Sequence, residues 1–392
     1  MRICSIITSF AAGGAEVLAA NLTSAFVKAG HGSTMLALCD AAAVGNSEAY
    51  EEALKQRIRS SGGEARSLEL VNRRNLLAGA IAMRKSISDI DPDIIHVHTA
   101  QALLMLLLAG VRRPTVYTHH NIRCNFPLWL FRAFDRVVDR YIAIGGACHD
   151  LLEGAVRKPI ILIRNGVPAD FSVAAPRVKL ARDPVIFAAG ALTPQKDYGT
   201  LIRAFSPVVR KLNATGRRPL LRIAGGGSLM DRLQALVDEL QLAESVELLG
   251  TRSDVPELMR QSDLMVNSSE FEGLPIALIE AVMSALPIVA TDVGGNSELV
   301  EPNVNGLLTP AGDPEALSQA VLSVLEDEAR YVSMSLASSE KSGAFTLENC
   351  ARAHLKLYAD IGPKPACAGS FQTVRPLPIP DRGIHQKYSG RI

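Results

Sequence analysis

Short apolar runs rich in β-branched residues alternate with longer stretches of helical periodicity along most of the chain. In the first half this pattern predicts helices such as 15–29 and 74–90, and strands at 2–8, 32–39, 93–98, 115–119, 141–145 and 160–165. In the second half it predicts helices at 197–213, 228–241, 254–261, 275–285 and 313–328, and strands at 185–190, 220–225, 246–250, 264–269 and 287–291. Strands that alternate with helices are typical of parallel sheets, so we expect an α/β protein with two doubly wound domains.

A segment without periodicity separates the two sets of strands. Residues 165–184 are rich in Pro and Ala, which predicts a join between a domain of residues 1–170 and a second domain of residues 171–346. A last helix, 347–361, is expected to cross back to the first domain. The Pro-rich tail, 362–392, lacks periodicity and is expected to be disordered or extended.

Composition places the chain among ordinary globular proteins. Of its 392 residues 48% are hydrophobic and 21% are charged, which is enough apolar sequence for a core in each half. The six cysteines are scattered without a C-x-x-C pair, which argues against a disulfide framework or a structural metal and favours a reducing cytoplasm. The start, MRICSIITSF, does not resemble a signal peptide, and the apolar run 102–110 is shorter than the ~20 residues of a membrane span. We therefore expect a cytoplasmic protein, with a buried helix at 102–110.

Charge is distributed unevenly under a formal net charge of +1. Up to Asn165 there are 19 Lys and Arg against 14 Asp and Glu, a balance of +5, and the remaining 22 against 26 give −4. The segment 125–141 also carries apolar side chains at helical spacing, with arginines at intervals of four. Two interpretations stay open: a face that touches an anionic membrane at the inner side of the cell, or an apolar stripe packed on the sheet beneath solvated arginines.

The stretch EFEGLPIALIEAVMSALP, residues 270–287, contains two acids in unusual places. Pro275 suits the first turn of a helix, so Glu272, Gly273 and Leu274 are expected in a loop at the mouth of that helix, where unpaired N–H groups attract anions. Glu280 lies within an apolar helix, where an unpaired carboxylate is costly. It faces a ligand in a cleft between the domains, pairs with a buried Lys or Arg, or lies on an exposed sliver of the helix.

Other residues fit the same cleft, because ligands of doubly wound sheets bind at the carboxyl ends of the strands. Gly13 and Gly14 follow the first strand and would let backbone approach a phosphate, although a simple turn explains them equally well. Lys196 follows another strand and suits a diphosphate, with a surface lysine as the alternative. His96 and His98 share one face of a strand and are expected to be buried and hydrogen-bonded. The D-x-D strings within 89–93 lie at a strand's amino end, so no metal is predicted there.

The chain resembles the retaining GT-B glycosyltransferases, in particular family 4. The resemblance covers about residues 2–360 and rests on EGLPIALIE (272–280), which matches the E-x7-E motif, together with other segments in the family's order. These segments are GGAE (13–16), PDIIHVHTA (92–100), VYTHHN (116–121), NGV (165–167), GALTPQKDYGTLIRAF (190–205), IAGGGSLMDRL (223–233), LLGTRSDVPELM (248–259) and ATDVGGNSELV (290–300).

This resemblance implies a GT-B fold, with an acceptor-side N-terminal domain, a nucleotide-sugar-binding C-terminal domain and a cleft between them. It implies that Glu272 contacts the sugar of the donor, that Glu280 holds the ribose, and that His120 lies near the transferred sugar. Lys196 would hold the diphosphate. The site residues it implies are, for catalysis, Glu272, His120 and Lys196, and for donor binding, Gly13, Gly14, Lys196, Arg252, Gly273, Leu274 and Glu280. The family usually has an arginine where this chain has Ala191, which leaves open whether Lys196 and the helix mouth suffice, whether Arg252 replaces it, or whether the enzyme is weak.

The function expected from the resemblance is retaining transfer of a sugar from a nucleotide-diphosphate-sugar to a hydroxyl acceptor, without metal or other cofactor. Lipopolysaccharide, exopolysaccharide or another glycoconjugate would be the product, the acceptor would be a glycan or a lipid-linked molecule, and nucleic acid is no partner. Three alternatives stay open: a nucleotide-sugar epimerase, a dinucleotide-dependent oxidoreductase, and a degenerate homologue that binds nucleotide without catalysis. The missing G-x-G-x-x-G motif argues against the oxidoreductase.

Overall fold

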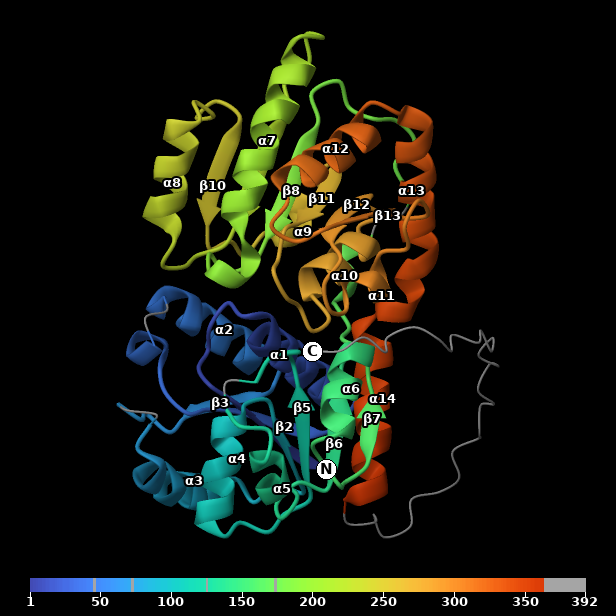
Figure 1. The fold of residues 1–392 in the computed structure, drawn as a ribbon. Coiled ribbons are helices and arrows are strands. Elements are labelled where there is room, and N and C mark those ends of the chain that lie inside the picture. The colour runs from blue at the N-terminus through green and yellow to red at the C-terminus, as the bar shows by residue number, and fades with distance from the viewer. Residues whose placement is uncertain (45–46, 72–73, 125, 173–174, 363–392) are drawn as a thin grey trace.

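The computed structural model describes residues 1–44, 47–71, 74–124, 126–172 and 175–362, which form two α/β domains, one above the other in Figure 1. The N-terminal domain contains a sheet whose strands pair in parallel in the order β3-β2-β1-β4-β5-β6-β7. These strands are β1 (Arg2–Ile7), β2 (Gly32–Ala37), β3 (Glu64–Ser67), β4 (Ile94–Val97), β5 (Thr115–His119), β6 (Arg140–Ala143) and β7 (Ile160–Leu162). The central strands β1, β4 and β5 are almost entirely buried, as expected for a parallel sheet covered on both faces.

Helices cover both faces of this sheet. They are α1 (Gly14–Lys28), α2 (Glu48–Ser60), α3 (Leu76–Ile90), α4 (Ala100–Ala109), α5 (Leu130–Phe134) and α6 (Gly146–Glu153), with the 3-10 turns η1 (Ala41–Val44) and η2 (Ala169–Phe171). Helix α4 corresponds to the apolar run and is largely buried, as predicted. No helix in the described ranges has the length and apolar character required to cross a bilayer.

The C-terminal domain contains a second parallel sheet with the order β10-β9-β8-β11-β12-β13. Its strands are β8 (Val185–Ala189), β9 (Leu220–Ala224), β10 (Val246–Gly250), β11 (Leu264–Asn267), β12 (Ile288–Thr291) and β13 (Gly306–Thr309). Its helices and turns are η3 (Pro194–Lys196), α7 (Tyr198–Asn213), α8 (Met230–Glu239), α9 (Val255–Arg260), α10 (Ile276–Met283), α11 (Asn296–Leu299), α12 (Pro314–Leu325), α13 (Glu328–Lys341) and η4 (Ser342–Phe345). Two doubly wound domains are therefore confirmed.

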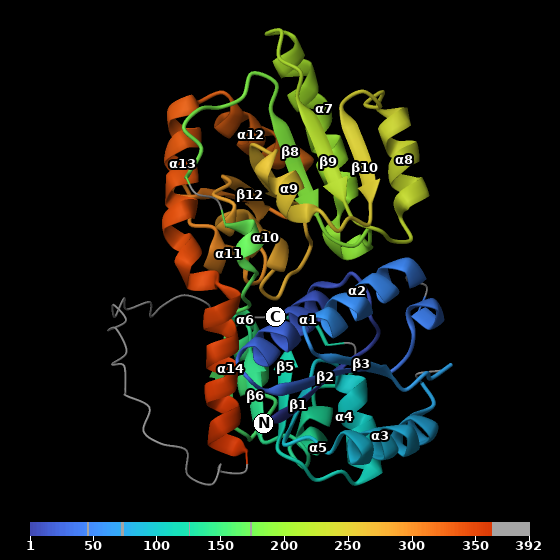
Figure 2. The same cartoon turned by 180° about the vertical axis from the view of Figure 1, so that it is seen from behind.

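The chain crosses between the domains twice, at neighbouring places. Val167 donates to the carbonyl of Phe345 and accepts from the amide of Leu347, both at 2.9 Å. Gly166 fits here because a Cβ at this position would lie 2.6 Å from the Thr346 carbonyl oxygen. The last helix, α14 (Leu347–Ile361), then packs on α1 of the N-terminal domain, and Figure 2 shows it beside that domain. The predicted tail lies outside the described residues from 363 onward.

Two edge strands and one long helix differ from the sequence prediction. Strands β3 and β13 were not predicted: β3 reads EARS, which has no apolar run, and β13 is only the short stretch GLLT. The helical pattern over 125–141 is wrong as a single helix, since only Leu130–Phe134 is helical and β6 begins at Arg140. Phe131 and Phe134 are fully buried, so this segment packs into the core.

Candidate functional site

Glycine-rich loops gather at the carboxyl ends of the first strands of the C-terminal sheet. The amide of Leu192 donates to the carbonyl of Gly226 at 2.9 Å, and the amide of Gly225 donates to that of Gly250 at 2.8 Å. A Cβ at Gly225 would lie 1.9 Å from the carbonyl oxygen of Gly190, so only glycine permits this approach. The loops after β8, β9 and β10 therefore form one surface made of backbone.

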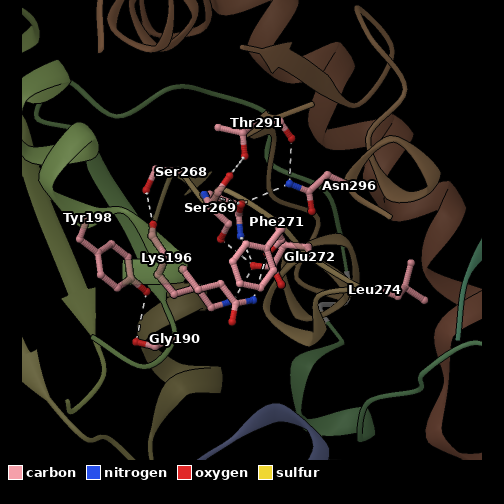
Figure 3. A network of polar contacts seen from close by, with 12 residues as sticks. Gly190, Lys196, Tyr198, Ser268, Ser269, Phe271, Glu272, Leu274, Thr291 and Asn296 are labelled. Atoms are coloured by element: carbon pink, nitrogen blue, oxygen red, sulfur yellow. Dashed lines mark hydrogen bonds and ion pairs between the residues drawn. The ribbon is translucent and has the colours of Figure 1, made fainter. Parts of the chain in front are cut away.

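Glu272 lies at the centre of a buried polar network beside these loops (Figure 3). Its Oε1 accepts from Lys196 Nζ at 2.5 Å, from Ser269 Oγ at 2.6 Å and from Asn267 Nδ2 at 3.3 Å. Its Oε2 has no hydrogen-bond partner among the described residues and is not one of the buried unpartnered atoms. One oxygen of Glu272 is thus fixed by the protein, and the other is free to accept a hydrogen bond from a ligand.

Asn267 and Asn296 hold the loop that carries Glu272. Asn296 Nδ2 donates to Asn267 Oδ1 at 3.2 Å and to the carbonyl of Thr291 at 2.8 Å, and Thr291 Oγ1 donates to the carbonyl of Ser269 at 2.6 Å. These side chains tie the ends of β11 and β12 together beneath the site (Figure 3). We did not identify them from the sequence, although the polar run NSS at the end of an apolar strand was a usable signal.

Lys196 closes the network from the turn η3 after β8. Its side chain is 18% exposed and that of Glu272 is 6% exposed, so the ion pair is shielded from water on most sides. The next residue, Asp197, adopts a left-handed φ of 42° and caps α7, which begins at Tyr198, by accepting from the amide of Thr200. The predicted Lys196 and Glu272 therefore lie together, joined directly to each other.

Glu280 lies on α10, half-buried, and makes no hydrogen bond or ion pair to any residue that the structure describes. Burial raises the pKa of its carboxyl to about 8. The pKa of Tyr50 on α2 is raised by burial and, further, by the charges of Glu280 and Glu16. Glu280 therefore lies near α2 of the other domain. Of the alternatives set by the sequence, the pair with a buried Lys or Arg is therefore wrong for the described part of the chain, and Glu280 is partly exposed on the side of the N-terminal domain.

The mouth of α10 meets the N-terminal domain through small residues. A Cβ at Gly14 would lie 3.4 Å from Ile276, the first residue of α10, and a Cβ at Gly273 would lie 2.3 Å from the carbonyl oxygen of His120. Asn165 Nδ2 donates to the carbonyl of Leu274 at 2.9 Å across the same join. Gly13 caps α1 with an ordinary negative φ, so no left-handed turn demands a glycine there. The structure thus brings Gly14, Gly273, Leu274 and His120 together.

His120 is one member of a histidine cluster beside the join. Its Nε2 lies 2.9 Å from Nδ1 of His98, and burial lowers its pKa to about 3. His96 is fully buried and bonds Thr118 Oγ1 and Tyr358 Oη, each at 2.7 Å, as predicted for a satisfied core histidine. The same prediction holds only in part for His98, which is partly buried and hydrogen-bonded through Nδ1, while its buried Nε2 has no partner in the described ranges. An alternating strand pattern cannot distinguish these two histidines.

Two further positions lie outside the Glu272 network. Arg252 is exposed and forms a salt bridge with Asp254 at 2.5 Å, and Ala191 is exposed in the loop after β8. Arg123, from the N-terminal domain, instead lies 4.0 Å from the ring of Phe271, next to Glu272. This cation–π contact was not predicted, and it brings a second positive charge to the site from the opposite domain.

Metal-type ligands cluster only on a surface helix in the part of the chain that is described. His149, Asp150 and Glu153 on α6 place their ligand atoms within 4.8 Å of one another, and both acids are exposed. Asp91 and Asp93, from the D-x-D strings, contact Arg2 instead. We assign no metal to either group.

Comparisons with known proteins agree with this architecture. The model described as "Glycosyltransferase Family 4" matches residues 12–171, and that described as "Glycosyl transferases group 1" matches residues 174–341. An exopolysaccharide phosphotransferase of Streptomyces coelicolor is 29% identical over 72% of this chain and 30% of its own length. A UDP-Gal:alpha-D-GlcNAc-diphosphoundecaprenol alpha-1,3-galactosyltransferase of Escherichia coli is 30% identical over 38% of each chain. The matches thus span less than half the length of these relatives.

A solved structure resembles the whole described fold. The Anabaena protein HepE, in complex with UDP and glucose, superposes with a TM-score of 0.76 at 22% identity, covering 92% of this chain and 100% of its own. This likeness confirms the predicted GT-B arrangement of two facing domains.

Proposed function

The chain belongs to the group 1 glycosyltransferases of the GT-B fold, and we propose that it transfers a sugar from a nucleotide-diphosphate-sugar to a hydroxyl acceptor with retention of configuration. The product would be a polysaccharide, a lipopolysaccharide or another glycoconjugate. The observation that carries the proposal is the half-satisfied Glu272, with Oε1 held by three donors, one of them the partly shielded Lys196, and Oε2 free.

Lys196 and Glu272 neutralise each other in the absence of a ligand. A diphosphate would accept a hydrogen bond from the ammonium of Lys196, and this charge-assisted bond would replace the one to the carboxylate of Glu272. Ser269 and Asn267 would keep Glu272 in place after this exchange, because their hydrogen bonds do not involve the lysine. Glu272 could then accept hydrogen bonds from the hydroxyls of the sugar, while Lys196 stabilises the charge that develops on the leaving diphosphate.

The nucleotide would lie along the C-terminal loops. No atom lies within 4 Å of the place where a Cβ of Gly250 would stand, so the loop after β10 leaves room for a flat base, and Glu280 has no partner among the described residues. Two ribose hydroxyls that donate to Glu280 would favour its ionised form and lower its raised pKa. Retention follows from front-face attack, in which an oxygen of the leaving phosphate takes the proton of the acceptor hydroxyl. The protein then supplies positioning and charge stabilisation rather than a general base.

Transfer is tested by incubating the protein with UDP-, GDP- and ADP-sugars and with oligosaccharide or polyprenyl-diphosphate-linked acceptors. We expect one donor class to yield product, and an anomeric configuration by NMR that equals that of the donor. Free sugar or an epimerised nucleotide sugar without product would favour the epimerase. Nucleotide binding without turnover of any donor would favour the degenerate homologue, for which the exposed Ala191 is the motivating observation.

We further propose that the N-terminal domain touches an anionic membrane that carries the acceptor. Leu77 and Ile81 on α3, Leu108 on α4, and Leu128 and Trp129 before α5 are large apolar side chains that are roughly half or more exposed. These elements lie at the end of the domain far from the C-terminal domain (Figure 1), so the contact would leave the site free. The charge of +5 up to Asn165 complements anionic lipid.

Sedimentation with vesicles tests the membrane contact. We expect binding to phosphatidylglycerol vesicles and not to phosphatidylcholine vesicles, and loss of binding in the double variant Leu77→Glu, Ile81→Glu. Leu336→Glu is the matched control, since Leu336 is an exposed leucine on α13 of the other domain. Equal binding by the double variant and the control would contradict the proposal.

A further inference from the structure

His98 is placed to act on the site through His120. Both residues follow the carboxyl ends of neighbouring parallel strands, β4 and β5, and their rings stack at 5.1 Å between centroids with an interplanar angle of 23°. Nδ1 of His98 and Nε2 of His120 lie 2.9 Å apart, a hydrogen bond in which one ring must donate and the other accept.

The surroundings of His98 decide which ring donates. Burial lowers the pKa of His98 well below its ordinary value, and the neighbouring His120 and His354 lower it further, so the ring is neutral and carries one proton. Its Nε2 is buried without a partner among the described residues. A buried N–H without an acceptor is rarer in proteins than an unsatisfied acceptor, so the proton belongs on Nδ1. His98 therefore donates, and Nε2 of His120 accepts.

The tautomer of His120 follows from that of His98. A neutral imidazole that accepts at Nε2 carries its proton on Nδ1. Nδ1 of His120 has no hydrogen-bond partner in the described part of the chain, and it is not one of the buried unpartnered atoms, so a ligand can reach it. The backbone carbonyl of His120 lies against Gly273, the residue after Glu272, so His120 and Glu272 belong to segments that meet at the same join between the domains.

We propose that His98 is a positioning residue that locks His120 in the Nδ1–H tautomer, so that His120 presents a hydrogen-bond donor to a hydroxyl oxygen of the transferred sugar. Without His98, the free ring would exchange between two tautomers, and in one of them it would offer an acceptor at this position. The hydrogen bond from His120 to the sugar rests on the proposed function, whereas the assignment of the tautomer does not.

His96 packs against the ring of His98 and is itself held by two hydrogen bonds. Its ring lies 4.0 Å from that of His98, and both of its nitrogens are engaged, by Thr118 and by Tyr358 of the crossing helix α14. It has no hydrogen bond to His98 or His120. Removing the Tyr358 hydroxyl therefore disturbs the cluster without touching the bond between His98 and His120, which makes Tyr358→Phe the matched control.

The tautomer can be measured without substrate. In protein labelled with 15N-histidine, long-range 1H–15N spectra distinguish a protonated from an unprotonated ring nitrogen, and His120→Gln identifies the signals of His120. We expect Nε2 of His120 to be unprotonated in the wild type and in Tyr358→Phe, and to become partly protonated in His98→Ala. His98→Asn should restore the wild-type pattern, because the amide of Asn lies near the position of Nδ1 and can donate.

Activity gives the second readout. With a donor that the enzyme turns over, we expect kcat/KM to fall about 2- to 10-fold in His98→Ala, the effect of one hydrogen bond, and to recover in His98→Asn. A protonated Nε2 on wild-type His120, or an unchanged tautomer in His98→Ala, would overturn the proposal. Failure of every donor with the expected tautomers intact would instead refute the proposed function and leave the tautomer assignment standing.

Discussion

Glu280 should lower the stability of the protein at neutral pH, and replacing it should reveal by how much. Burial raises its pKa from 4.5 to about 8, so the folded state keeps a proton that the unfolded chain releases above its own pKa. Below about pH 4.5 the carboxyl is protonated in both states, and the stability is at its full value. Between pH 4.5 and about 8 only the unfolded chain loses the proton, so the free energy of unfolding falls as the pH rises. Above about pH 8 the folded carboxyl ionises too, and the fall ends. Glu280→Gln removes this dependence, because an amide does not titrate.

The magnitude follows from the size of the shift. Each pH unit between the two pKa values costs about 1.4 kcal/mol, so the interval from the unfolded pKa of 4.5 up to pH 7 sets an upper bound of about 3.4 kcal/mol. Glu280 is only half-buried, and water at its open side reduces the cost. We therefore expect the free energy of unfolding of Glu280→Gln to exceed that of the wild type by about 1–3 kcal/mol at pH 7. Near pH 4.5 the two free energies of unfolding should be almost equal.

Guanidinium unfolding of both proteins at half-unit steps from pH 4.5 to 8.5 measures this difference. Glu340→Gln serves as the control, because Glu340 is an exposed glutamate on α13 in the same domain. Added nucleotide should stabilise the wild type, by about 2.7 kcal/mol at 100 times its Kd, and should stabilise Glu280→Gln much less. A Glu280→Gln protein that is less stable than the wild type at pH 7, or a difference that does not change with pH, would refute the reasoning.

Three further predictions concern the charges around Glu272. Lys196→Ala should lower kcat by at least ~100-fold, because it removes the cation that stabilises the leaving diphosphate; near-normal turnover would contradict the assignment. Ala191→Arg should tighten the binding of nucleoside diphosphate about 10-fold or more in titration calorimetry, since it restores a charge-assisted bond to phosphate. An unchanged Kd would show that position 191 does not face the ligand. Arg123→Ala should lower kcat/KM about 2- to 5-fold, through loss of the cation–π contact with Phe271, while Arg123→Lys retains part of it. A wild-type kcat/KM in Arg123→Ala would show that this contact does not contribute to turnover.

The sequence by itself determined the architecture, because the periodicity of apolar residues is a local property. The buried runs of β1, β4 and β11 and the amphipathic pattern of α7 were readable from spacing alone. The helix after Pro275 was predictable for the same reason, since proline sets the local backbone. Edge strands such as β3 were not, because their pairing depends on the neighbouring strand and not on their own side chains.

Only the tertiary structure decided the chemistry of the site. Lys196 and Glu272 are 76 positions apart, and their contact depends on the packing of η3 against the loop after β11. His96 and His98 were expected to share one strand face, yet Thr118 of β5 and Tyr358 of the crossing helix α14 bond both nitrogens of His96, whereas His98 bonds His120. A sequence specifies which groups are present. The free energy of placing them depends on burial and on partners that other segments supply.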